Sequence, residues 1–104
     1  MADNVNHPSH YADHCSLECY KVMRLTYGPY HYFYYCLQNA FKYMWRYKFK
    51  NGEEDLAKTE WYLNSANEIL EKSTENGPLY YDDKERYDEI RTMLEEIRST
   101  TYAD

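Results

Sequence analysis

Apolar residues recur at helical spacing through most of the chain after residue 15, and three breaks divide them into about four expected helices. The breaks are Gly28-Pro29, Asn51-Gly52 and Asn76-Gly77-Pro78, where glycine ends a helix readily and proline starts or stops one. The expected helices cover residues 16–27, 29–49, 54–72 and 83–99. Residues 1–14 read as an extended arm. The pattern therefore predicts an all-α fold, a compact bundle of about four helices with an extended N-terminal arm.

The third expected helix has a clear buried face. On a helical wheel its core stripe consists of Leu56, Thr59, Tyr62, Leu63, Ala66, Ile69 and Leu70. Trp61 lies on the other side, among polar residues, so packing of its own helix does not explain it. The fourth helix has a narrower apolar stripe, which is typical of an outer helix or of a helix that contacts a partner.

The second expected helix is apolar or aromatic around most of its circumference, which predicts that it is central. Its apolar face consists of Phe33, Cys36, Leu37, Ala40, Phe41 and Met44. Its polar exception is an arc with Tyr35, Asn39, Lys42 and Arg46 at helical spacing. Such an arc can clamp a phosphate or carboxylate, with Arg46 giving paired hydrogen bonds and Lys42 a point charge. The alternative is a solvated face or an ion-pair network with acids of the third helix.

The length of 104 residues predicts one domain, divided into the arm 1–14, a helical core 15–72 and an acidic C-terminal helix 73–104. Tyrosine accounts for 14 residues, so the core must use aromatic rings. So many rings, together with the narrow stripe of the fourth helix, exceed what one small core buries, and we expect a homo-oligomer.

The net charge of -6 is unevenly distributed. Residues 1–52 carry three acids against six bases, whereas residues 53–104 carry 15 acids against six bases. The summed field repels phosphate, so we expect no direct non-specific binding of nucleic acid, while a small anion at the N-terminal half is compatible with the charge. No apolar run long enough to span a membrane and no signal peptide is visible. We therefore expect a soluble cytoplasmic protein, with no membrane partner and with reduced thiols.

Two clusters contain residue types that bind metals. His7, His10 and His14 precede Cys15 and Cys19, but this spacing is not that of a common zinc finger, and no zinc is expected. His7 and His10, which flank Pro8, are better interpreted as hydrogen-bond donors that tie down the arm or contact an anion.

The second cluster, Glu53-Glu54-Asp55 with Glu60, offers carboxylates for Mg²⁺. The simpler interpretation is that acids at the start of a helix are favoured by its dipole. The three glycines form no P-loop and no dinucleotide-binding fingerprint.

Several short motifs are similar to those of one known family. They are V-N-H-P-S-H-Y at 5–11, L-E-C at 17–19, N-A-F-K-Y-M-W-R at 39–46, K-N-G at 50–52, E-D-L-A-K at 54–58 and W-Y-L at 61–63. The combination resembles the SaV-like family of small proteins of tailed phages and prophages, over about residues 4–70. A branch of that family is described as a kinase of deoxynucleoside monophosphates, so the resemblance implies a phage origin and a nucleotide ligand.

The leading hypothesis is a phage-encoded nucleotide-binding protein of the host cytosol, which binds a nucleoside phosphate or a nucleotide-derived signal. Its expected binding residues are His7, His10, Tyr11, Asn39, Lys42, Arg46 and Trp61. In the kinase version, without a P-loop, Lys42 and Arg46 are catalytic residues that stabilise phosphoryl charge, and Mg²⁺ is held by the nucleotide and Asp55. The alternative is a non-enzymatic counter-defence inhibitor, whose acidic C-terminal half blocks the nucleic-acid groove of a host nuclease such as a CRISPR effector. A structural oligomer without a ligand is the third interpretation.

Overall fold

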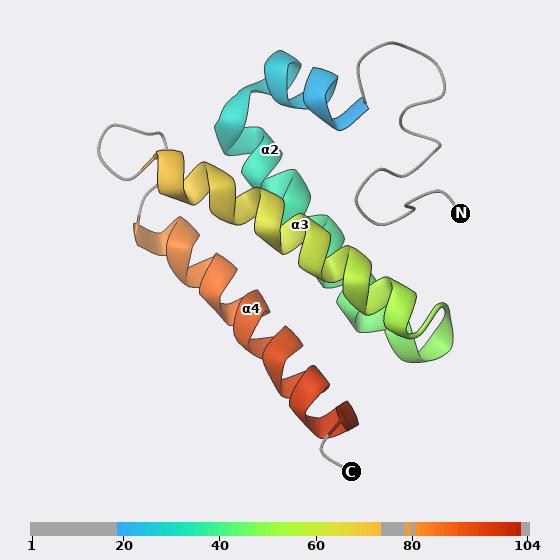
Figure 1. Cartoon of the computed structure of the whole chain (residues 1–104). Helices are drawn as coiled ribbons and strands as arrows, with labels where there is room; N and C mark the ends of the chain where they lie inside the picture. The colour runs from blue at the N-terminus through green and yellow to red at the C-terminus, as the bar shows by residue number, and fades with distance from the viewer. Residues whose placement is uncertain (1–18, 74–78, 80, 103–104) are drawn as a thin grey trace.

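The computed structural model describes residues 19–73, 79 and 81–102, and this part of the chain is built from helices. Their bounds are α2 Cys19–Arg46, the 3₁₀-helix η1 Tyr47–Phe49, α3 Glu53–Lys72 and α4 Tyr81–Tyr102. The second half of α2 and α3 run side by side in opposite directions, and α4 packs against both (Figure 1). The all-α class is confirmed. The predicted arm, with His7, His10 and Tyr11, lies outside the described residues.

The predicted number of helices is wrong, because the described residues form three α-helices and not four. The first two expected helices are joined in α2, which contains Gly28 with a non-helical backbone at φ 85° and ψ 167°. Only glycine adopts this conformation without strain, and Pro29 then begins the next helical stretch, where its missing N–H costs nothing. The chain therefore changes direction within α2 without a loop (Figure 1).

A tight turn after η1 reverses the chain and starts α3. Gly52 has φ 55°, and its N–H donates to the carbonyl of Tyr47 at 2.8 Å. The carbonyl of Gly52 accepts the N–H of Asp55 at 3.0 Å and so begins the helix. Three acids in this first turn, Glu53 to Asp55, suit the positive end of the helix dipole. The turn places the end of α2 against the start of α3.

The core lies between α2 and α3 and is closed by α4. Its fully buried side chains include Phe33, Leu56, Leu63, Ile69 and Leu94. The predicted stripe of α3 is buried as expected, except for the half-buried Leu70. The prediction fails for Phe41, which is exposed because α3 and α4 leave its side of α2 uncovered.

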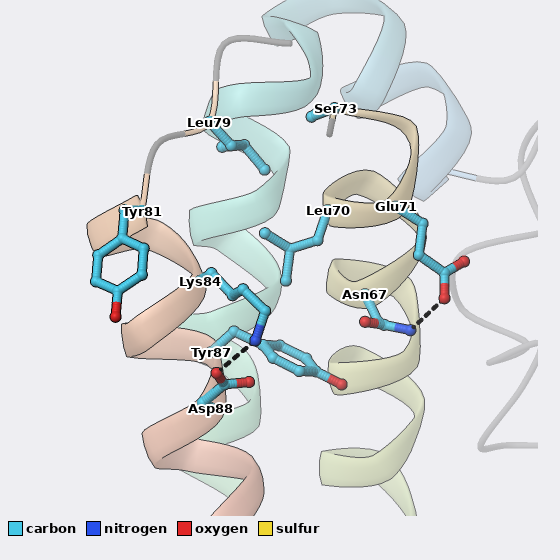
Figure 2. Close-up of a pocket in the computed structure, with 9 residues that line it drawn as sticks. All are labelled: Asn67, Leu70, Glu71, Ser73, Leu79, Tyr81, Lys84, Tyr87 and Asp88. Carbon is cyan, nitrogen blue, oxygen red and sulfur yellow. Dashed lines mark hydrogen bonds and ion pairs between the residues drawn. The ribbon is translucent and has the colours of Figure 1, made fainter. Parts of the chain in front are cut away.

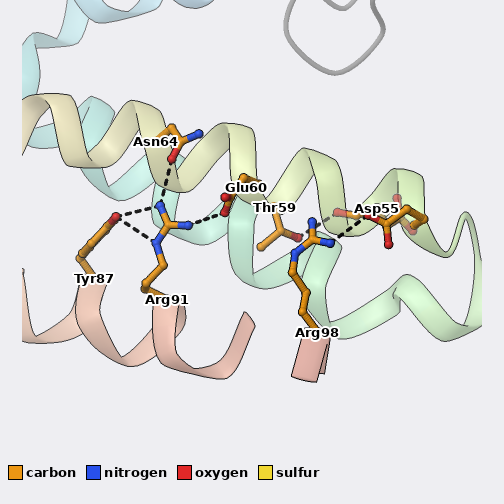
Figure 3. Close-up of polar contacts among 8 residues, drawn as sticks. Asp55, Thr59, Glu60, Asn64, Tyr87, Arg91 and Arg98 are labelled. Carbon is orange, nitrogen blue, oxygen red and sulfur yellow. Dashed lines mark hydrogen bonds and ion pairs between the residues drawn. The ribbon is translucent and has the colours of Figure 1, made fainter. Parts of the chain in front are cut away.

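Polar side chains also connect α4 to the rest of the fold. Arg91 donates to Glu60, to the Asn64 amide oxygen at 3.0 Å and to the Tyr87 hydroxyl (Figure 3). Arg98 also donates to Glu53 at 2.9 Å. Of the apolar side chains of α4, Tyr87 and Leu94 are buried, in agreement with the predicted outer helix.

Candidate functional site

Three cations surround the ring of Tyr43, on the side of α2 that borders α3. The ammonium of Lys42 lies 4.6 Å from the ring centroid, the guanidinium carbon of Arg46 lies 4.7 Å away, and the ammonium of Lys58 lies 5.2 Å away. Each distance is within the range of a cation–π contact. The arrangement brings two cations from the predicted arc of α2 together with one from α3.

A chain of aromatic contacts connects Tyr43 to Trp61. Tyr43 stacks on Tyr62 with centroids 5.9 Å apart and an interplanar angle of 10°. Tyr62 meets Trp61 edge to face at 5.0 Å, and Trp61 meets Tyr20 in the same way at 5.2 Å. Trp61 is half-buried and packs against the first part of α2, which explains its position away from the core stripe of its own helix. We call Lys42, Tyr43, Lys58 and Trp61 the basic-aromatic face.

The guanidinium of Arg46 is paired with the buried carboxylate of Asp55. Its Nε lies 3.3 Å from Oδ2 and its Nη2 lies 3.4 Å from Oδ1. Asn51 donates to the same carboxylate from its backbone N–H at 3.1 Å and from its side-chain amide at 3.3 Å. The alternative interpretation of the polar arc was an ion-pair network with acids of the third helix. Arg46 agrees with that interpretation.

The environment of Asp55 keeps its carboxylate charged. Burial raises the pKa of Asp55, but the hydrogen bonds from Arg46 and Asn51 outweigh burial and hold this pKa below its usual value. Both carboxylate oxygens already accept from Arg46 and Asn51, so a metal ion would have to displace these donors. Asp55 therefore does not fit the predicted role as a magnesium ligand.

The other acids of the predicted carboxylate cluster also have basic partners. Glu53 pairs with Arg98, Glu54 lies 3.7 Å from Lys58, and Glu60 pairs with Arg91. Within the described residues, no group of three or more His, Cys, Asp or Glu is placed to hold a metal ion. Glu53 and Glu60 therefore join α3 to α4, whereas Glu54 pairs within α3.

The two other predicted site residues of α2, Lys42 and Asn39, differ in exposure and in their hydrogen-bond partners. Lys42 is exposed, and it forms no ion pair with a carboxylate in the part of the chain that the structure describes. Asn39 is half-buried and donates from its amide nitrogen to the carbonyl of Tyr35 at 2.9 Å. Lys42 is thus the predicted cation best placed to meet a ligand.

Sequence reasoning missed Tyr43 and Lys58 as members of the site. Tyr43 was one of many rings on α2, and nothing in the sequence marked it as the ring beneath three cations. Lys58 carried a usable signal, because it precedes Trp61 by three residues on α3 and so shares its side of the helix.

The structure also has a cavity of about 330 Å³ between the end of α3 and the start of α4 (Figure 2). Leu70, Leu79 and Tyr87 form its apolar lining, and Lys84 pairs with Asp88 at 2.7 Å on its edge. None of the predicted site residues lines it. We therefore place the candidate site at the basic-aromatic face and not at this cavity.

A family model described as a protein of unknown function, DUF3310, matches residues 5–64. This range includes all four residues of the basic-aromatic face and ends before α4. No curated protein and no solved structure matches the chain. None of the described helices has the length and apolar character needed to cross a membrane.

Proposed function

The chain belongs to the DUF3310 family, and since the description of this family gives no function, we propose one from the site: the protein binds a nucleoside phosphate at the basic-aromatic face. The observation that supports the proposal is the cluster of cations around Tyr43, a ring that is connected to the indole of Trp61 through Tyr62. Similarity to the SaV-like proteins favours the same ligand class and a phage origin.

The phosphate end of the ligand is assigned to Lys42 and Lys58. Both ammonium groups lie over the ring of Tyr43, at 4.6 and 5.2 Å from its centroid. Lys42 is exposed, and the partner of Lys58, Glu54, is itself about half exposed at 3.7 Å. A surface pair of this kind contributes little, so a phosphate can compete for Lys58 at low cost. Charge-assisted hydrogen bonds from two ammonium groups then hold the phosphate.

The base is assigned to Trp61. Three residues after Lys58 on α3, it lies on the same side of the helix, and its indole is only half-buried. Stacking of a base on an aromatic side chain contributes about 1–3 kcal/mol and tolerates different bases. The face therefore provides one end for phosphate and one end for a base.

In this proposal Arg46 does not contact the ligand but positions the two helices that do. Its guanidinium holds Asp55 at the start of α3 and lies beside Tyr43, so it fixes the two helices that carry Lys42 and Lys58. Phosphoryl transfer requires groups that reach the phosphate and stabilise its charge. Since Arg46 is paired with Asp55, and Asp55 does not fit Mg²⁺, we propose binding without a kinase step.

Calorimetric titration of the full chain with a deoxynucleoside monophosphate tests the proposal. The Lys42→Gln variant is expected to bind at least about tenfold more weakly, because it removes the exposed ammonium at the phosphate end. Lys72→Gln is the matched control, because it removes the same charge from an exposed position in the last turn of α3. The nucleoside without phosphate is expected to bind weakly to all three proteins. Equal affinity of the wild type and Lys42→Gln for the monophosphate would refute the assignment.

A second candidate function is inhibition of a host nuclease, and the charge on α4 favours it. The arginines of α4 are engaged by other side chains, Arg91 and Arg98 by acids of α3 and Arg86 by the Tyr34 hydroxyl. Exposed acids remain on the outer surface of the helix, among them Glu85 and Glu89. Such a surface is repelled by nucleic acid and attracted by a basic groove.

Inhibition of DNA cleavage by a purified CRISPR nuclease tests this second candidate. The wild type is expected to slow cleavage less as salt rises, because salt screens the attraction. The double variant Glu85→Lys and Glu89→Lys should relieve the inhibition, while Lys42→Gln should leave it unchanged. Cleavage at an unchanged rate with the wild type at low salt would eliminate this candidate.

A further inference from the structure

A group of large apolar side chains is exposed where α2 ends and α4 passes. Phe41, Trp45, Phe49 and Met93 are 45%, 72%, 81% and 41% exposed, and we call them the aromatic surface. Phe41 and Trp45 stack on each other with centroids 5.9 Å apart. Single exposed apolar residues are ordinary, whereas a contiguous group marks an interaction site.

The aromatic surface borders a groove of about 550 Å³ between η1 and α4. Trp45 and Phe49 form one side, Met93 forms part of the other, and Met44 and Ile97 also line the groove. Lys48 lies on the side of η1 and Glu96 lies on the side of α4. Both are exposed, and no ion pair joins them within the described part of the chain.

The opposite charges on the two sides make this surface complementary to itself. A two-fold axis through the groove would place the Lys48 side of one copy against the Glu96 side of the other, and the reverse. Each pair of charges would then be formed twice, with the rings covered between them. A partner surface that carried charges of one sign only would be complementary to Lys48 or to Glu96, but not to both.

The exposed area is sufficient for such an interface. From the exposed fractions of the four side chains, each copy offers roughly 500 Å² of apolar surface. Two copies would cover about 1,000 Å² before the polar rim is added, which is the size at which specific interfaces begin.

We infer that the aromatic surface is the two-fold interface of a homodimer, with Lys48 of each copy facing Glu96 of its partner. This inference is independent of nucleotide binding, because it rests on different residues, although Phe41 and Trp45 belong to the same turns of α2 as Lys42. It names the contact that would cover Phe41, Trp45 and Phe49.

Sedimentation velocity of the full chain over a range of micromolar concentrations tests the interface. The wild type is expected to sediment as a dimer. Phe49→Lys is expected to sediment as a monomer, because it places a charge at the centre of the apolar contact. Phe49 is 81% exposed, so this substitution leaves the core intact, and Leu25→Lys, also at an exposed apolar position, is the matched control that should remain a dimer.

A charge-reversal experiment tests the pairing itself. Lys48→Glu alone and Glu96→Lys alone should each raise the dissociation constant of the dimer about tenfold or more, because like charges face each other twice. An equimolar mixture of the two variants should restore a dimer, because both pairs are again of opposite sign in the heterodimer.

Three results would overturn the inference. The first is a wild type that is monomeric at all concentrations, as it would be if another part of the same chain covered Trp45. The second is a dimer that survives Phe49→Lys, and the third is a mixture of the charge variants that does not associate, since either would place the interface elsewhere.

Discussion

The guanidinium of Arg46 and the buried carboxylate of Asp55 join the end of α2 to the first turn of α3 through two contacts of 3.3 and 3.4 Å. Two further bonds from Asn51 to the same carboxylate fix the intervening turn. The pair therefore sets the separation of the two helices that carry Lys42 and Lys58. Its consequences for stability are measurable independently of any ligand.

Replacement of Arg46 by alanine should destabilise the fold by about 3–5 kcal/mol, because it leaves the charge of Asp55 buried without its main partner. Lys42→Ala, four residues earlier on α2, removes an exposed cation and should change stability by less than about 0.5 kcal/mol. Urea unfolding followed by circular dichroism measures both values. Equal stability of the two variants would show that the Arg46 pair contributes nothing.

Acid should weaken the protein partly through Asp55. Because the pKa of this carboxyl is lower in the folded protein than in the unfolded chain, where it is about 3.9, its stabilising contribution is present above that value. The contribution is lost as the pH falls through the lower pKa of the folded state. Asp55→Asn should therefore be less stable than the wild type at pH 7, and the difference should shrink below about pH 4. Urea midpoints measured from pH 7 to pH 3 check this, and a difference that does not change with pH would contradict it.

The thiols should differ in reactivity. Burial raises the pKa of Cys36 to about 12, whereas Cys19 is exposed. At pH 8 an ordinary thiol carries about a thousandfold more thiolate than Cys36, and the thiolate is the reactive form. Brief alkylation followed by peptide mass spectrometry should label Cys19 in the native protein and Cys36 only after unfolding. Comparable labelling of both in the native state would show that this part of the core is open.

The Tyr34 hydroxyl should contribute to the docking of α4. It donates to the buried carboxylate of Asp83 and accepts from Arg86 at 2.7 Å. Tyr34→Phe deletes one partner of a buried acid and should cost about 1–3 kcal/mol. Tyr27→Phe, at an exposed tyrosine of the same helix, is the control and should be neutral within about 0.5 kcal/mol. Thermal unfolding of both variants measures the difference, and an unchanged midpoint for Tyr34→Phe would remove this contact from the account.

Much of the helical architecture could be predicted from local patterns. Gly28-Pro29 and Asn51-Gly52 mark real changes in the backbone, because their conformations depend on the residues themselves. The number of helices could not be predicted, since the sequence does not show whether a break at Gly28 inserts a loop or only a bend. The apolar stripe of α3 was predicted because burial follows helical periodicity.

The candidate site was only partly visible in the sequence. A helical wheel places Lys42 and Arg46 on one side of α2, but it contains no information on what the facing helix presents. The pairing of Arg46 with Asp55 depends on the turn at Gly52, and the position of Lys58 over Tyr43 depends on how α3 packs. Both are tertiary features, and they changed the role of Arg46 from ligand contact to positioning.

The position of the ligand tests the central claim most directly, and the two tryptophans allow it to be measured in one nuclear magnetic resonance titration. Trp61 belongs to the basic-aromatic face and Trp45 to the aromatic surface. Addition of a deoxynucleoside monophosphate to the ¹⁵N-labelled full chain should shift the indole N–H signal of Trp61 and the backbone signals of Lys42 and Lys58. The indole signal of Trp45 should remain in place. A titration that shifts Trp45 and leaves Trp61 unchanged, or that shifts neither, would contradict the account.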